Sequence, residues 1–236
     1  VPAPPGRMLK GQMEGFPVLP AGLAAYPRTP ALAADLAAAY DAVQMQTREA
    51  RRDGQNADAV TQEARQAARQ RGREYYAQAV AARAQPAVAS DTPFVERLVH
   101  FWANHFAVSA DKQIMVGLTG GFEFDAIRPH VLGKFREMLH AVERHPAMLL
   151  YLDQAQSVGP NSPVGQRFAQ REQGQRRLRL NENLAREILE LHTLGVRTVY
   201  TQADVTAFPR AMTGWTVAGL RRGQGGRLAQ GSGQAG

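Results

Sequence analysis

The segment LNENLAREILELHTLG, residues 180–195, places several side chains capable of chemistry on one side of a predicted helix. At about 100° per residue, Asn183, Arg186, Glu187 and Glu190 fall within a fan of roughly that width. Two carboxylates three residues apart could bind a divalent cation or act as general acid and base if they lay in a cleft. The simpler alternative is a surface ion pair between Arg186 and Glu190, worth a few tenths of a kcal/mol. The spacing alone favours the ion pair.

The opposite side of this predicted helix is apolar, with Leu184, Ile188 and Leu191 beside His192. On such a face His192 is expected to be a buried, hydrogen-bonded histidine rather than a metal ligand. Glu187, Glu190 and His192 do not share a face, so a metal site would need ligands from elsewhere in the chain. The sequence does not identify a metal or a cofactor.

The best candidates elsewhere lie in HFWANHF, residues 100–106. Asn104 and His105 near a carboxylate face could form a general-base arrangement. In the alternative, Asn104 and His105 satisfy backbone groups in the core. Trp102 and Phe106 are one turn apart and predict an aromatic anchor.

Several classes of site are excluded or weakly supported. The chain has no cysteine, which excludes disulfides, thiolate metal sites and cysteine nucleophiles. No P-loop, no G-x-S-x-G serine and no HExxH zinc motif occurs. No run of eighteen apolar residues is present, so a membrane-spanning helix is not expected.

The formal net charge of +7 invites a nucleic-acid interpretation, but its location argues against one. Residues 167–179 carry five arginines against Glu172, and the tail after Trp215 carries three more arginines, so these two segments hold the whole excess. Both are rich in Gly and Gln, whereas a specific nucleic-acid surface is expected to show a basic stripe with interleaved aromatic residues on an ordered element. We therefore do not expect a specific nucleic-acid surface.

Helical periodicity and capping signals predict an all-α, irregular multi-helix fold, and no β alternation persists. Thr92 is a candidate N-cap, Gly195 a candidate C-cap, and Thr201 with Asp204 a capping box. Pro129 is expected to stop a short helix over 122–127. We predict four segments: an extended Pro-rich arm (1–30), a helical hairpin (31–90), a helical core (91–216) and a disordered Gly/Gln-rich tail (217–236).

Long motifs in a fixed order carry a family resemblance: FVERLVHFWANHFAVS, AIRPHVLGKFREML, HPAMLLYLDQAQSVGPNS, LNENLAREILELHTLGV, YTQADV and TGWT. Together they resemble the bacterial family known as domain of unknown function 1800. The resemblance covers roughly residues 36–216.

The resemblance implies a helical protein without an established activity, acting in or beyond the periplasm. Members of this family are frequently encoded beside exported, sulfatase-like proteins, which implies such a protein as partner. No signal peptide is visible at the start of this chain. The family's signature positions fall on Trp102, Asn104, His105, His145, Pro146, Asn181, Glu182, Asn183, Arg186, Glu187, Glu190, His192 and Trp215.

This chain departs from the family pattern in three places. Arg179 stands before Leu180 where the family has glycine, a glycine turn is lost near Arg197, and the family's usual C-terminal half is missing. We therefore expect a C-terminally truncated member.

Two functions are open. The favoured one is a non-catalytic scaffold or partner-binding domain of an exported bacterial system, whose Asn–Arg–Glu network holds helices together. The alternative is an exported enzyme, such as a metal-dependent hydrolase, with Glu187, Glu190 and His105 as catalytic residues. The candidate binding residues are Asn104, Asn181, Asn183, Arg186, His192 and Trp102.

Overall fold

A computed structural model describes residues 5–18, 28–163, 165–166, 180–196 and 198–217. These residues form helices and connecting loops, with no strand among them, which confirms the predicted all-α fold. Contacts divide the chain into two compact units, residues 1–147 and 148–236. The predicted hairpin and the first part of the predicted core thus share unit 1. The predicted tail, apart from Val217, lies outside the described residues.

The first helix lies where we predicted an extended arm. Helix α1 (Pro5–Glu14) occupies part of residues 1–30, so that part of the prediction is corrected. Proline is tolerated in the first turn of a helix, where its missing N–H has no intrahelical partner. No further proline follows before residue 17, and Met, Leu, Lys, Gln and Glu are good helix formers. Prolines at both ends of the segment concealed the helix between them.

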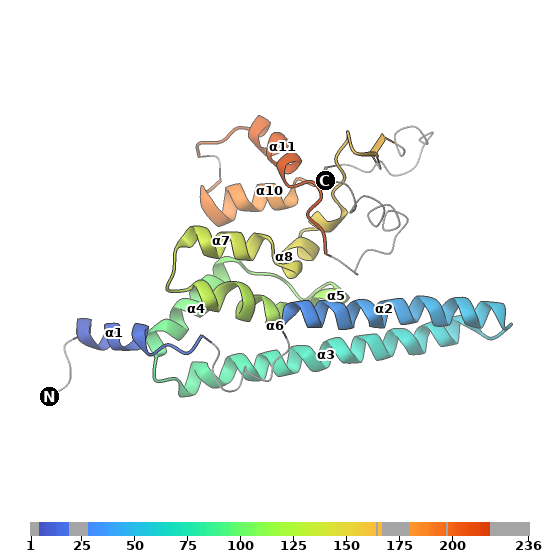
Figure 1. Cartoon of the computed structure of the whole chain (residues 1–236), viewed down its shortest axis with the longest axis horizontal. Coiled ribbons are helices and arrows are strands. Elements are labelled where there is room, and N and C mark those ends of the chain that lie inside the picture. The colour runs from blue at the N-terminus through green and yellow to red at the C-terminus, as the bar shows by residue number, and fades with distance from the viewer. Residues whose placement is uncertain (1–4, 19–27, 164, 167–179, 197, 218–236) are drawn as a thin grey trace, which may run out of the picture. The chain divides into compact units, whose positions relative to one another are not determined.

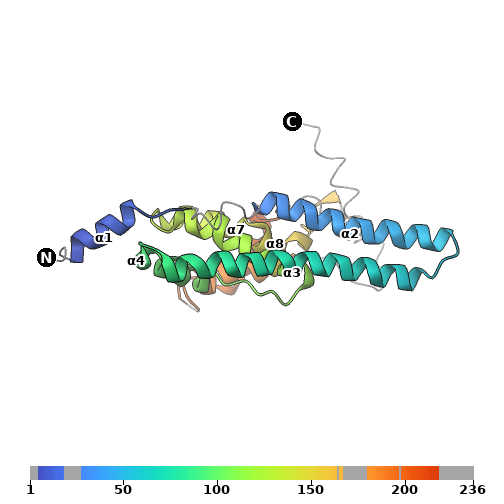
Figure 2. The same cartoon turned by 90° about the horizontal axis from the view of Figure 1, so that it is seen from below.

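Two long helices form an antiparallel hairpin in unit 1 (Figures 1 and 2). They are α2 (Thr29–Arg52) and α3 (Ala57–Ala89). The turn between them holds Gly54 at φ 65°, and the Asn56 side chain caps α3 by accepting from the N–H groups of Asp58 and Ala59. Alanine at many contact positions allows the two helices to pack closely along their length.

Shorter helices complete the core of unit 1: α4 (Pro93–His105), α5 (Gln113–Val116), α6 (Thr119–Phe122), the π-helix η2 (Glu123–Ile127), the 3-10 turn η3 (Arg128–His130) and α7 (Phe135–Glu143). α5 and α6 pack on α3, while α4 and α7 pack on η2. Gly117 allows the close approach: a Cβ there would lie 2.7 Å from Cδ1 of Leu36 and 3.5 Å from Cα of Gly72. The fully buried side chains here include Leu36, Val95, Val99, Phe106, Met115, Leu118 and Ile127.

Two local expectations need correction in this core. Pro129 does not stop the helix over 122–127: it lies in the first turn of η3, where its missing N–H costs nothing. Thr92 precedes α4 but does not cap it through its side chain, because its hydroxyl hydrogen-bonds to the Ser90 hydroxyl (2.9 Å).

Unit 2 begins at Met148, within α8 (Pro146–Tyr151). It contains the 3-10 turn η4 (Gln154–Gln156), α10 (Asn183–Glu187), the π-helix η5 (Ile188–Thr193) and α11 (Gln202–Ala211). The capping box of Thr201 and Asp204 opens α11 as predicted, and Gly195 (φ 88°) ends η5 in the left-handed conformation. α10 packs on α11.

Candidate functional site

The polar face predicted for residues 181–194 exists, and its centre is an ion-pair chain. The Arg186 guanidinium lies 3.0 Å from Oε1 of Glu190 and 3.5 Å from Oε2 of Glu182. Arg186 is 40% exposed, so solvent screens both interactions. The surface ion pair favoured by the spacing is therefore present. Glu187 is half-buried on the neighbouring turn, and Asn183 is exposed.

Asn181 connects the start of α10 to the chain that precedes it in unit 2. Its Nδ2 donates to the Leu152 carbonyl (2.9 Å), its backbone N–H donates to the Ser157 hydroxyl (3.0 Å), and its Oδ1 accepts from the Asn183 N–H (2.8 Å). Nearby, Nε2 of the fully buried Gln154 donates to the Met212 carbonyl (2.9 Å). These amides hold α8, α10 and α11 in register, which is a structural use of a polar cluster.

The π-helix η5 changes which side chains the second half of this helix buries. His192 is buried, as predicted, together with Leu184 and Ile188. Leu191 was predicted on the same apolar face, but it is 58% exposed. A π turn closes i→i+5 hydrogen bonds and holds more residues per turn than an α turn. Each residue is therefore rotated by a smaller angle from the one before it. As a result the Leu191 side chain points away from the buried side, whereas His192 remains on it.

In unit 1 the end of α4 carries an aromatic cluster. Trp102 stacks with Phe106 (centroids 5.8 Å apart) and meets Phe135 of α7 at 5.5 Å. The His105 ring packs edge-on against Trp102 and Phe106, at 5.4 and 4.6 Å. The aromatic anchor is therefore present, and His105 is part of it.

Asn104 lies on the solvent side of α4. It is exposed, so the alternative in which it satisfies core backbone groups does not apply to it. Phe101 is 59% exposed and meets Trp102 edge-on at 5.1 Å, and Phe135 is 41% exposed. The aromatic cluster of Phe101, Trp102, His105, Phe106 and Phe135 thus reaches the surface of unit 1.

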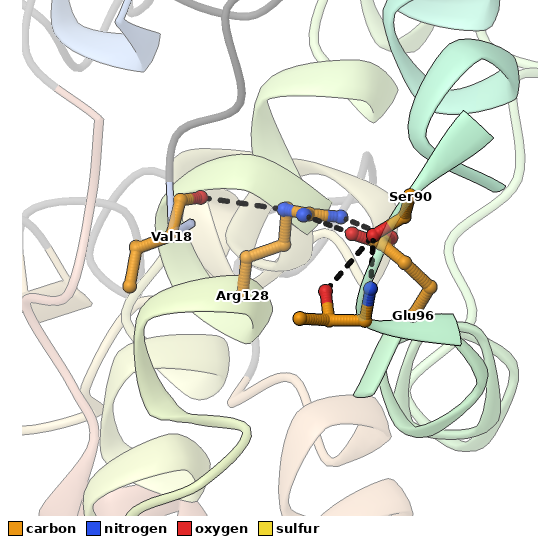
Figure 3. Close-up of polar contacts among 5 residues, drawn as sticks. Val18, Ser90, Glu96 and Arg128 are labelled. Carbon is orange, nitrogen blue, oxygen red and sulfur yellow. Dashed lines mark hydrogen bonds and ion pairs between the residues drawn. The ribbon is translucent and has the colours of Figure 1, made fainter. Parts of the chain in front are cut away.

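The most deeply buried charges of unit 1 were missed in the sequence. Arg128 and Glu96 form a bidentate pair, with N–O distances of 2.8 and 2.7 Å and side chains only 1% and 3% exposed (Figure 3). Nε of Arg128 also donates to the Val18 carbonyl (3.3 Å). A signal for Glu96 was available, since a helical wheel places it about 60° from Val99, at the edge of the apolar face that Val95 and Val99 share. No pattern in the sequence around Glu96 identifies Arg128 as its partner.

Two further carboxylates lie on the π-helix η2 and pair with Arg83 of α3 and with Arg28, which directly precedes α2. Glu123 accepts from Nε of Arg83 (2.6 Å), and Asp125 lies 2.6 Å from Nε of Arg28. π-helical turns are frequent at functional sites. Here the turn directs Glu123 toward α3 and Asp125 toward Arg28, so these charges connect elements of unit 1.

His145 occupies a helix boundary, as its position before Pro146 suggests. It is buried, its Nδ1 accepts from the Ala147 N–H at the start of α8 (3.1 Å), and its ring meets Phe122 edge-on at 5.2 Å. Burial lowers the pKa of His145 to about 4, although Asp125 acts in the opposite direction. His145 is therefore neutral at ordinary pH and serves as an acceptor.

With this geometry in view, comparison with family models gives a match to "Protein of unknown function (DUF1800)" over residues 19–234. The chain belongs to this family. Comparison with curated proteins and with solved structures finds no match. The description of the DUF1800 family assigns no activity to its members.

The candidate site residues of the DUF1800 chain fall into both units. Trp102, Asn104 and His105 belong to unit 1, whereas the candidates from Asn181 to His192 belong to unit 2. Within the described residues, no three His, Asp or Glu side chains gather closely enough to hold a metal ion. In the same part of the DUF1800 chain, no helix is long and apolar enough to cross a membrane.

Proposed function

We propose that this chain is a non-catalytic, partner-binding helical domain of an exported bacterial system. The observation that carries the proposal is the pairing with arginine of three carboxylates that are buried or largely buried. Glu96, Glu123 and Asp125 each contact an arginine from a different element, at 2.6 to 2.8 Å. Charges used in this way fix how helices pack. They are not arranged as a nucleophile with a base.

The aromatic cluster supplies a surface for a partner. Phe101 and Phe135 are exposed, and Trp102 stands between them. Aromatic side chains dominate the energetics of protein interfaces, because they bury a large area with few rotatable bonds. The partner we propose is the exported, sulfatase-like protein that the family resemblance implies, which places the complex in or beyond the periplasm.

Metal analysis tests the non-catalytic part of the proposal. We expect no stoichiometric metal in the purified chain or in the double variant Glu187→Gln, Glu190→Gln. The variant should melt about 1 °C lower or less, because it loses only the partly exposed Arg186–Glu190 pair. The matched control is Glu137→Gln, an exposed carboxylate on α7. Stoichiometric metal that disappears in the double variant would instead establish the hydrolase alternative with Glu187 and Glu190 as ligands.

Calorimetric titration against the purified sulfatase-like protein tests the surface. Phe101→Ser should weaken binding at least about tenfold, the loss typical of an aromatic side chain at the centre of an interface. Val88→Ser is the control, because Val88 is exposed on α3 and lies outside the aromatic cluster. Equal affinities for both variants would exclude the aromatic cluster as the binding surface.

A further inference from the structure

Residues 5–18, which we call the strap, contact α4 and η3, two elements that lie far from the strap in the sequence. Oε1 of Gln12 accepts from the Phe94 N–H at 2.8 Å, between residues 82 positions apart. The Phe16 ring lies 5.1 Å from the Arg128 guanidinium carbon, and the Val18 carbonyl accepts from Nε of Arg128 at 3.3 Å. Figure 3 shows Val18 and Glu96 on either side of Arg128.

The groups that the strap contacts are ones that need a partner. The first N–H groups of a helix have no intrahelical acceptor, and the Thr92 side chain does not supply one to α4. Gln12, which is buried, fills this position. Arg128 directs its two terminal nitrogens to Glu96, so its Nε and the face of its guanidinium remain for Val18 and Phe16. These are the contacts a bound peptide makes: a side-chain oxygen on a helix N-terminus, an aromatic ring on a cation and a backbone carbonyl.

The rest of the strap is loosely held. Met8, Leu9 and Met13 of α1 are exposed, and Lys10 and Glu14 form an ion pair in which both are more than two-thirds exposed. The family match begins at residue 19, whereas Phe94, Glu96 and Arg128 lie within it. The contacted surface and the strap are therefore separable features of the chain.

We propose that the N-terminus of α4 together with Arg128 forms a peptide-binding site, and that residues 12–18 occupy it as an internal ligand. The strap opens as a unit. A partner peptide takes its place if it offers a side-chain carbonyl or carboxylate oxygen and, four residues later, an aromatic ring. This site is separate from the aromatic cluster, so the inference does not depend on the partner proposed above.

Hydrogen exchange on the unmodified chain tests the opening. The amide of Phe94 should exchange at the same rate as the amides of α1, because one opening exposes both. That rate should exceed the rate for Val142, in the buried part of α7, by at least about tenfold. A Phe94 amide that exchanges as slowly as that of Val142 would show that the strap opens only when unit 1 unfolds, and would overturn the proposal.

Rescue in trans tests the site. An attached strap acts as a ligand at high effective concentration, so the site is best probed in the full chain carrying Gln12→Ala and Phe16→Ala. A synthetic peptide of residues 5–18 should bind this variant and restore protection of the Phe94 amide. The same peptide with both alanines should do neither. The control variant with Met8→Ala and Met13→Ala should keep its strap in place. It should therefore not bind the peptide, and its Phe94 amide should remain protected without it. A double variant that exchanges faster at Phe94 but does not respond to the parent peptide would leave the strap as a structural element and contradict the binding site.

Discussion

At the scale of single residues, the buried carboxylates Glu96 and Glu123 are each paired with an arginine. The Glu96–Arg128 pair is the clearest case, because both side chains are almost completely removed from water. Removing two charges from water is costly, and their attraction offsets that cost only when the geometry is good and the remaining donors are satisfied. Here the bidentate contact and the Val18 carbonyl provide both conditions.

Glu96→Gln should therefore destabilise the chain by about 3–5 kcal/mol, since it leaves the Arg128 charge buried without its counter-charge. Denaturant unfolding measures this loss. Glu190→Gln is the matched control: it breaks a partly exposed pair with Arg186 and should cost no more than about 0.5 kcal/mol. Similar losses for the two variants would mean that burial does not determine the contribution of these pairs.

His145 provides a pH-dependent contribution with a defined sign. Its pKa in the folded chain is about 4, below the ordinary value of 6.5, so the unfolded chain binds its proton more readily. The contribution is fully present above pH 6.5 and is lost as the pH falls toward 4, by about 3 kcal/mol at most. Stability curves of the parent and of His145→Asn, which cannot titrate, should diverge in slope over this window. Parallel curves would contradict the prediction.

At the scale of elements, the π-helices decide which side chains point inward. η2 directs Glu123 toward Arg83 of α3 and Asp125 toward Arg28. η5 keeps His192 buried while exposing Leu191. An α-helical wheel drawn through either segment assigns some of these residues to the wrong side.

Paired alanine substitutions test the register of η5. Leu184→Ala removes a fully buried side chain and should cost about 2–5 kcal/mol. Leu191→Ala should change the unfolding free energy by no more than about 0.5 kcal/mol, because the side chain is largely in solvent. An uninterrupted α-helix would make both substitutions costly, so the Leu191 result distinguishes the two geometries.

The start of α10 depends on Asn181 rather than on its neighbour Asn183. Asn181→Ala loses the hydrogen bonds to the Leu152 carbonyl and the Asn183 N–H, and should cost about 2 kcal/mol. Asn183→Ala alters an exposed side chain and should be close to neutral. Thermal unfolding of both variants checks the difference, and equal losses would contradict the assigned role of Asn181.

At the scale of the whole molecule, the positive net charge is unevenly distributed between the described residues and the rest of the chain. Nine of the 28 Lys and Arg residues and one of the 21 Asp and Glu residues fall outside the described part. The remainder, 19 basic against 20 acidic residues, is nearly neutral. The basic excess therefore lies in residues outside the described part of the chain.

We expect weak, sequence-independent binding to duplex DNA, with dissociation constants of roughly 10⁻⁴–10⁻⁶ M at physiological salt. Fluorescence anisotropy with two unrelated duplexes, at low and physiological salt, measures this. Both affinities should fall together as salt rises, because only phosphate contacts are involved. A preference of about a hundredfold for one duplex would require a base-reading surface and would contradict the prediction.

The sequence by itself determined the features that depend on neighbours along the chain. The all-α class, the capping box at Thr201, the glycine at the end of η5 and the Arg186–Glu190 pair all follow from spacings of a few residues. Their physics is local: hydrogen bonds at helix ends and side chains one turn apart. The aromatic anchor of Trp102 and Phe106 follows in the same way.

Only the tertiary structure decided which distant groups meet. Arg128 pairs with Glu96, which lies 32 residues away in the sequence, and Gln12 caps α4 through Phe94, which lies 82 residues away. No periodicity encodes such pairs, because they depend on how whole helices pack. The sequence also did not predict the π turns. An i→i+5 turn carries the same residue types as an α turn and differs only in which side chains it buries. For the same reason Leu191 was placed inward and is exposed.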